Sequence, residues 1–425
     1  DNQRNLWVCG SHDLTLINFK YQHSKRLIAP AMEDIRSVAF DHNNRIWVGS
    51  VNGMLICYDA AGQQMGYMNT NGQLQKAPTA FSERIYMLYE DRKQRLWIGT
   101  KGQGLYCLMP DGTLRQYTHN VKNRFSINND DIYGMDEDTQ GRLWIGTFGG
   151  GLNYIDEQAD GSMRFIHADN LLRQLPGTYY NKIRRITHTR NGVILVSTTG
   201  GLITFSDRFH NPKNIRYYFN RHDETDTTSL RTSDVFQTLV CQDGSILICT
   251  LGGGLQKVMD TNLLHNHLKL QTVKNISLND GLVQSMMEDK RNNVWIIRET
   301  SVNRMSKDKK IVSQFGPNDL TGEVEFTEAK PAYNPRTGSI AIGTMKGIIV
   351  IHPELMKKSS YKPNIVFTSV TYQGETEPEP VLNVKTLEVP SDKRNMTIAF
   401  AALDYSDNEL VKYAYRLEGA DAKWN

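Results

Sequence analysis

Long hydrophobic runs are missing from this chain of 425 residues, whose longest unbroken apolar stretch is the six residues from Ile398 to Leu403. A membrane-spanning helix needs about 18 or more such residues, so no segment is predicted to cross a bilayer as a helix. The sequence opens on Asp1-Asn2-Gln3-Arg4, which has neither the basic nor the apolar region of a secretion signal. The sequence by itself therefore assigns the chain to no compartment.

An excess of charge of one sign is also missing. The chain has 49 Lys and Arg residues against 46 Asp and Glu residues, for a net charge of +3. This balance excludes the dense basic surface of a dedicated DNA-binding protein and the high net charge of a disordered acidic chain. We expect no nucleic acid among the partners of these residues.

Cysteine is scarce, and no two cysteines have the CxxC spacing of a zinc ribbon or a thioredoxin motif. Two of them take a small-residue position in the repeat described below, and two others share one position on its third strand. Such positions suit small hydrophobic side chains. We therefore predict five free thiols with a packing role, at Cys9, Cys57, Cys107, Cys241 and Cys249.

What the sequence does have is a repeat. Arg95-Leu96-Trp97-Ile98-Gly99-Thr100 recurs as Arg142-Leu143-Trp144-Ile145-Gly146-Thr147, and weaker copies place the same anchor at positions 7, 47, 195, 247, 295 and 341. An Asp stands six residues before five of the anchors, at positions 1, 41, 91, 138 and 289. Alternating apolar residues between Asp and Gly turns predict short strands joined by hairpins. Four strands per unit of about 40–50 residues are typical of a β-propeller blade.

The chain holds eight anchors but only seven inner strands, near residues 34–40, 84–90, 131–137, 183–189, 234–240, 282–288 and 325–333. Because innermost strands close a propeller ring, we predict an all-β, seven-bladed β-propeller over residues 31–354, with eight blades as the alternative. Residues 1–30 are expected to be the remainder of a preceding blade, with a strand near residues 26–29 closing the ring. Residues 355–425 are expected to begin an Ig-like β-sandwich, with strands at 365–368, 397–400 and 412–417.

The unit from Glu137 to Leu152 resembles the two-component regulator propeller repeat. The tail resembles the Y_Y_Y domain that follows such repeats, on Tyr405, Tyr413, Tyr415, Leu417-Glu418-Gly419 and Trp424. Repeats followed by this tail are similar to the periplasmic sensor region of hybrid two-component systems from carbohydrate-degrading gut bacteria.

This resemblance implies a periplasmic, non-catalytic region that senses an oligosaccharide and passes a conformational signal toward a membrane-linked histidine kinase. It also implies that the full-length parent is a homodimer, and that contact with the membrane comes only through segments downstream of this chain.

Three motifs are interpreted as structural. The runs Gly149-Gly150-Gly151 and Gly252-Gly253-Gly254 are followed by strands, whereas a phosphate loop leads into a helix with Lys and Ser or Thr. The repeated Asp is explained by an Asx-turn better than by metal binding. His265 and His267 have no third ligand at matching spacing. We therefore expect no metal, no cofactor and no catalytic residue.

The segment from Arg173 to Arg185 breaks the repeat and combines aromatic with basic residues just before an inner strand. In a propeller, the loops that lead into inner strands share a face with the turns between the second and third strands. Tyrosine rings suit the faces of sugars, and Arg suits a carboxylate or sulfate. We predict Tyr179, Tyr180 and Arg184 as ligand-binding residues; the alternative is a solvated loop whose tyrosines pack on the neighbouring blade.

Two other functions remain open from the residues alone, because a fold does not fix a function. One is a non-catalytic protein-interaction scaffold. The other is a propeller lyase or hydrolase, for which His188 and Glu299 are the candidate residues, although they form no set with a nucleophile in the sequence.

Overall fold

The computed structural model describes residues 5–17, 23–273, 282–308, 310–320, 322–357, 364–382, 386–389, 391, 393, 395–403, 413–419 and 421–425. Strands dominate these residues, and the helices among them are three single turns of 3-10 helix, η1 (Thr178–Asn181), η2 (Pro212–Asn214) and η3 (Pro317–Asp319). None of the described helices is long and apolar enough to span a membrane. Residues 23–356 form one compact unit, and residues 1–22 and 357–425 are grouped in a second.

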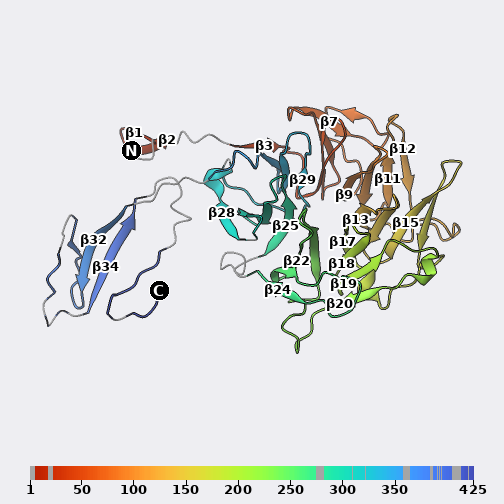
Figure 1. Cartoon of the computed structure of the whole chain (residues 1–425). Coiled ribbons are helices and arrows are strands. Elements are labelled where there is room, and N and C mark those ends of the chain that lie inside the picture. Colours follow the sequence, from red (N-terminus) through yellow and green to blue (C-terminus); the bar gives the residue numbers. More distant parts are fainter. Residues whose placement is uncertain are drawn as a thin grey trace. The chain divides into compact units, whose positions relative to one another are not determined.

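The unit of residues 23–356 consists of antiparallel sheets that follow one another along the chain and surround a common centre (Figure 1). Its first three sheets are β4 (Ile35–Phe40), β5 (Ile46–Ser50), β6 (Leu55–Tyr58), β7 (Gln64–Met68) and β8 (Leu74–Gln75); β9 (Ile85–Glu90), β10 (Leu96–Thr100), β11 (Leu105–Leu108) and β12 (Leu114–Tyr117); and β13 (Ile132–Glu137), β14 (Leu143–Thr147), β15 (Gly151–Glu157) and β16 (Met163–His167).

Four further sheets continue the same pattern among the described residues. They are β17 (Ile183–His188), β18 (Val193–Thr198), β19 (Gly201–Ser206) and β20 (Tyr218–Asn220); β21 (Val235–Val240), β22 (Ile246–Thr250), β23 (Gly254–Val258) and β24 (Leu270–Thr272); β25 (Val283–Glu288), β26 (Val294–Arg298), β27 (Val302–Met305) and β28 (Ile311–Phe315); and β29 (Ala332–Tyr333), β30 (Ile340–Thr344), β31 (Gly347–Ile351) and β3 (Ser24–Ile28). The predicted all-β propeller fold is confirmed, and the described part of this unit contains seven sheets.

The repeated Asp organises the turn before each Trp strand. In the second sheet, Oδ1 of Asp91 accepts the backbone N–H groups of Lys93 and Arg95, at 2.9 and 3.0 Å. Its Oδ2 accepts Nε of Arg95 at 2.6 Å and Nε1 of Trp97 at 2.8 Å. The same Asp–Trp bond of 2.8 Å recurs from Asp41, Asp138 and Asp289. The Asx-turn interpretation is therefore confirmed, and the carboxylate also holds the buried indole.

The sheets form a closed ring because each one packs against the next. Seven clusters of buried apolar side chains lie between successive sheets, the last between the seventh sheet and the first. The small residue two places after the Trp anchor lies in these contacts. A Cβ on Gly146 would come within 2.4 Å of Ile183 in the next sheet, which explains why the position stays small.

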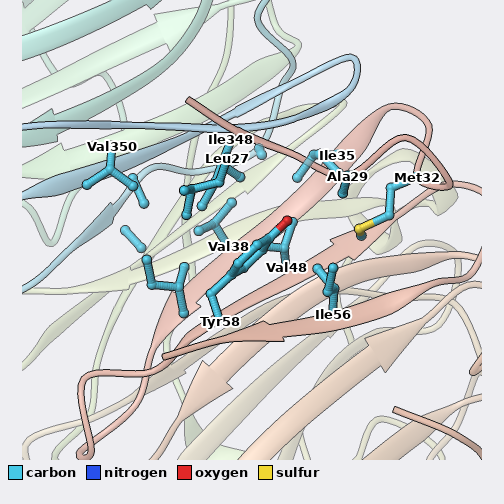
Figure 2. Close-up of a cluster of buried hydrophobic side chains, with 14 of the residues drawn as sticks. Leu27, Ala29, Met32, Ile35, Val38, Val48, Ile56, Tyr58, Ile348 and Val350 are labelled. Atoms are coloured by element: carbon cyan, nitrogen blue, oxygen red, sulfur yellow. The ribbon is translucent and has the colours of Figure 1, made fainter. Parts of the chain in front are cut away.

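The ring closes with a strand from before the first sheet. β3 pairs antiparallel with β31, from Ser24 opposite Ile351 to Ile28 opposite Gly347. Figure 2 shows the resulting seam, where Leu27 of β3 and Ile348 of β31 lie in one apolar cluster with Val38 and Val48 of the first sheet. The outermost position of the seventh sheet is thus filled by residues close to the predicted closing strand at 26–29.

The seventh inner strand is the least regular. Only β29 is formed as a strand there, and Phe326 and Lys330 make isolated bridges to Thr344 and Ser37. Pro331 lies in the middle of this stretch. Because proline cannot donate to a strand ladder, it interrupts the regular pairing predicted over 325–333.

No disulfide joins any of the five cysteines. Cys57, Cys107 and Cys249 are fully buried, and burial raises the pKa of each of these thiols to about 12. Since the thiolate is the reactive form, these residues act as small hydrophobic side chains, whereas Cys9 is exposed.

In the second unit, β1 (Leu6–Cys9) pairs with β2 (Leu14–Ile17). Separately, β32 (Ile365–Tyr372) pairs with both β33 (Glu379–Pro380) and β34 (Met396–Ala402). The strand predicted over 412–417 is wrong for residues 413–417, which are not in a strand. This segment matched the alternating pattern, but among its described residues only Tyr415 exchanges a pair of backbone hydrogen bonds, with Asn425. Alternation alone cannot supply the further pairs that a strand needs. Tyr405 and residues 358–363 lie outside the described residues.

Candidate ligand-binding face

Two sets of loops meet on one face of the ring. The residue that follows the second strand of a sheet donates its N–H to the carbonyl of the residue just before the inner strand. This bond recurs in six sheets at 2.8–3.2 Å, as Val51 to Asp34, Lys101 to Arg84, Phe148 to Asp131, Thr199 to Lys182, Leu251 to Asp234 and Met345 to Glu325. The geometry expected for the loops that lead into inner strands and for the turns between second and third strands is therefore confirmed.

At this face, six inner strands carry a bulge at their second residue. The pairing skips one residue after Ile35, Ile85, Ile132, Ile183, Val235 and Val283. A bulge redirects the extra side chain away from the regular pleat. Five of the displaced residues, together with Arg185 and Glu328, line a cavity at the centre of the ring: Arg36, Tyr86, Tyr133, Arg184 and Phe236. We call these seven residues the channel mouth.

An aromatic row crosses the channel mouth. The rings of Tyr86 and Tyr133 are stacked with their centres 4.4 Å apart, and Tyr133 is stacked on Phe148 at 4.8 Å. The ammonium of Lys182 lies 5.7 Å from the centre of the Phe148 ring. Tyr86, Tyr133 and Phe148 are all half-buried. Because Tyr133 is stacked between the other two rings, the row exposes ring edges more than ring faces.

Charged pairs flank the row. Arg36 contacts Asp34 at 2.7 Å and Glu328 at 2.6 Å. Arg184 binds both carboxylate oxygens of Asp234, at 2.6 and 2.7 Å. Bidentate pairs of this kind fix the guanidinium plane. Both Arg side chains are therefore held in a defined direction at the centre of the ring.

The structure does not bring the three predicted ligand residues into one pocket. Arg184 belongs to the channel mouth. Tyr179 and Tyr180 are in η1 and line a separate groove of about 820 Å³. Tyr179 is 50% exposed, whereas Tyr180 is 5% exposed and packs its ring 4.9 Å from that of Phe219. Tyr180 therefore has the packing role of the alternative interpretation, and Tyr179 offers the accessible ring.

The groove lies between two loops that lead into inner strands. One wall is η1 before β17, and the other is the loop of residues 221–233 before β21. Polar side chains dominate its lining, among them Arg221, His222, Asp223, Asp226 and His267. The ring of Tyr179 lies over Gly200, where a Cβ would come within 2.4 Å of it. The groove thus pairs an aromatic wall with hydrogen-bonding groups.

Sequence reasoning missed most of the channel mouth. The signal was available in the repeat: the residue after the first aliphatic of each inner strand is Arg36, Tyr86, Tyr133, Arg184, Phe236 or Gln284. The residue before it is always Ile or Val, and the residue after it is small or apolar except at Arg185 and Gln237. A position that varies within an otherwise regular unit is a candidate for ligand contact. What the sequence could not supply was the bulge that turns these side chains toward the ring centre.

The other candidate residues from the sequence, for metal binding and for catalysis, are not brought together among the described residues. The described part of the chain contains no cluster of three or more potential metal ligands. His188 donates from Nδ1 to a carboxylate oxygen of Asp136 at 2.9 Å, and this hydrogen bond raises the pKa of His188. Glu299 is exposed in the turn after β26, and its backbone carbonyl accepts the N–H of Phe326 at 2.7 Å. His265 and His267 make no metal-ligand set.

Comparison with protein families gives a match to the two component regulator propeller over residues 80–102 and 126–149. These segments contain the inner strand, the Asp turn and the Trp strand of the second and third sheets. A protein named histidine kinase P4, from Formosa agariphila, is 29% identical over 173 residues, which are 39% of this chain and 12% of that protein.

Solved structures of similar fold include two extracellular domains of putative two-component systems from B. thetaiotaomicron. Both are 19% identical and cover the whole of this chain, with TM-scores of 0.71 and 0.59. This chain covers 55% and 56% of them, so it spans about half their length. A streptogramin B lyase also shares the fold over 77% of this chain and 96% of its own, at 12% identity and a TM-score of 0.55. Two segments of the chain thus match the two component regulator propeller, and its fold resembles the extracellular domains of putative hybrid two-component systems.

Proposed function

We propose that this chain is a ligand-sensing, non-catalytic part of the extracytoplasmic region of a hybrid two-component system, and that its ligand is an oligosaccharide. The observation that carries the proposal is the channel mouth, where the backbone repeats from sheet to sheet while the side chain at the bulge changes. In the proposed parent protein, a homodimer anchored in the inner membrane, ligand binding at this periplasmic face changes the state of a histidine kinase.

The chemistry of the face supports a sugar ligand. Sugars present apolar ring faces together with many hydroxyl groups, so they suit aromatic surfaces bordered by fixed polar groups. The exposed ring of Tyr179 and the edges of the stacked rings of Tyr86, Tyr133 and Phe148 offer the first, and the oriented pairs of Arg36 and Arg184 offer the second. The groove beside Tyr179 has room for more than one sugar ring at about 820 Å³.

The streptogramin B lyase fold favours an enzyme as the second candidate. An enzyme of that kind needs an acid or base near the ring centre with a free path to substrate. His188 is engaged by Asp136, and Glu299 lies in a different turn. Neither residue lines the channel mouth or the groove. A scaffold that binds protein at the same face is the third candidate.

An array of oligosaccharides from plant and host polysaccharides, probed with this chain, tests the proposal. The oligosaccharide that binds most strongly is then titrated by calorimetry against Tyr179→Ala, Tyr86→Ala and Arg184→Ala. Loss of one well-placed charged hydrogen bond weakens binding by about 10- to 150-fold, and we expect losses in this range for Arg184→Ala. Arg115→Ala, at an exposed position on β12, and Tyr415→Ala, at an exposed position in the second unit, serve as matched controls. Equal affinities in all variants would show that the sugar does not bind at these residues. Binding of protein ligands instead of sugars would favour the scaffold.

A further inference from the structure

The Asp turns lie at the ends of the inner strands that are remote from the channel mouth, and three of these turns carry an arginine. Arg45, Arg95 and Arg142 stand four residues after the turn Asp in the first three sheets. Nε of each arginine donates to Oδ2 of that Asp at 2.6–2.7 Å. The local structure is thus the same at all three positions, and differences between them come from the neighbouring sheet.

Two of these arginines are covered by the end of the third strand in the following sheet. Nη1 of Arg95 lies 3.0 Å from a carboxylate oxygen of Glu157, the last residue of β15. Nη2 of Arg142 donates to the backbone carbonyl of Asp207, the residue after β19. The guanidinium carbon of Arg142 also lies 4.0 Å from the centre of the Phe209 ring. The exposed fractions of the two arginine side chains are 8% and 21%.

The third arginine, Arg45, has no such cover among the described residues. In the second sheet, Pro110 is at the position that Glu157 and Asp207 have in theirs, counted from the pairing with the second strand. Within the described residues, the only side-chain hydrogen bond of Arg45 is the one to Asp41. A guanidinium has five N–H donors, and 32% of this side chain is exposed. Its terminal nitrogens are therefore accessible to an acceptor from outside the ring.

A cavity of about 290 Å³ lies where the cover is missing, between the first and second sheets. Polar groups and partly exposed apolar groups line it together with Arg45: His42, Glu90, Gln94, Leu74, Leu108 and Met109. Small-molecule sites usually have about 300–1,000 Å³. A cavity at the lower end of this range suits one ring-sized group, not several sugar rings.

We propose that this cavity binds a peptide segment of a partner protein, which supplies the cover that the second sheet lacks. A backbone carbonyl of the segment accepts from Arg45, as the carbonyl of Asp207 does from Arg142. An aromatic side chain two residues later lies against the guanidinium of Arg45, as Phe209 does in the third seam. Arginine stacks on aromatic rings through its planar guanidinium.

Charge favours a neutral segment over an acidic one. Glu157 is held by Lys93 at 2.7 Å as well as by the arginine of its seam. The residue of the first turn that corresponds to Lys93 is Asn43, and the carboxylate of Glu90 lines the cavity. An added carboxylate would therefore meet one arginine that is already paired with Asp41 and would be repelled by Glu90. A carbonyl oxygen meets the same donors without that repulsion.

Two capped dipeptides, added to the intact chain, test the assignment by saturation-transfer difference NMR. N-acetyl-glycyl-phenylalanine amide has a carbonyl two residues before its ring, and N-acetyl-glycyl-alanine amide lacks the ring. We expect saturable binding of the first peptide and at least tenfold weaker binding of the second.

Two variants and a control locate the binding. Arg45→Met removes the donors, and loss of a charged hydrogen bond weakens binding by about 10- to 150-fold. Pro110→Glu supplies from the chain the carboxylate that Glu157 provides for Arg95, so we expect it to compete with the peptide and weaken binding at least tenfold. Arg216→Met is the matched control, because Arg216 is exposed over the ring of Tyr218 at 5.1 Å and does not line this cavity. Circular dichroism checks the fold of each variant.

Absence of binding to the wild type would overturn the inference, as would equal binding of the two peptides. Pro110→Glu decides the outcome if Arg45→Met does not fold, because unchanged binding in Pro110→Glu would place the peptide outside this cavity. None of these results bears on the oligosaccharide, since the cavity and the channel mouth share no lining residue.

Discussion

Trp144→Ala is expected to destabilise the propeller by about 3–5 kcal/mol, the usual cost of removing a buried aromatic side chain. The indole is 1% exposed and lies between the third and fourth sheets. Its ring centre is 5.0 Å from that of Tyr154 and 5.1 Å from that of Phe205 in the next sheet. The substitution leaves a cavity at the contact between the third and fourth sheets. It also leaves Oδ2 of Asp138 without the indole N–H that it accepts at 2.8 Å.

Urea unfolding followed by circular dichroism measures this loss. Trp424→Ala is the matched control, because Trp424 is 66% exposed and lies outside the propeller. The same change of residue there should alter the free energy of unfolding by about 0.5 kcal/mol or less. A loss below about 1 kcal/mol for Trp144→Ala would contradict the packing role of the repeat.

Asp91→Ala is expected to cost a similar amount, although it removes few apolar atoms. Its buried carboxylate accepts two backbone N–H groups, Nε of Arg95 and Nε1 of Trp97. The Arg95 side chain is itself 8% exposed. The substitution leaves Arg95 with Glu157 as its remaining partner, 3.0 Å from Nη1, and leaves the buried indole N–H and two backbone N–H groups without their acceptor. Loss of one partner of a buried ion pair costs roughly 3–5 kcal/mol.

Asp91→Asn refines the same test, because the amide keeps one oxygen for the turn but presents N–H groups to Arg95 and Trp97. We expect it to recover only part of the loss. Asp111 makes the same type of turn, with the Thr113 N–H at 2.8 Å, but it is fully exposed. Asp111→Ala should therefore have a much smaller effect on the urea midpoint. If both alanine variants shift the urea midpoint equally, the contacts of Asp91 with Arg95 and Trp97 add nothing to the stability of the turn itself.

The fold was predictable because the repeat encodes it at several levels at once. The Trp anchors, the Asp turns and the small residue at Gly146 each report one contact that recurs around the ring. Where a local pattern lacked such a contact, prediction was less successful. The segment 413–417 alternates in sequence yet is not a strand, and the seventh inner strand is interrupted at Pro331.

The site was harder to predict for a physical reason. The direction of a side chain at a bulge depends on strand pairing that skips one residue. Such a skip cannot be predicted from the sequence pattern. Burial of Tyr180 and exposure of Tyr179 likewise depend on which face of η1 meets Phe219. The loop could be chosen from its composition, but which of its two tyrosines is accessible could not.

The most direct test of the central account, that ligand binds on the channel-mouth face, is amide hydrogen exchange with and without the best oligosaccharide from the array. The account predicts slower exchange in the loops that lead into β13 and β17, around residues 129–133 and 178–184, and in the turn at 148–150, which hydrogen bonds to them. The Asp turns at 41–45, 91–95 and 138–142, which precede the second strands, should exchange as before. Protection confined to those Asp turns, with the channel-mouth loops unchanged, would contradict the account.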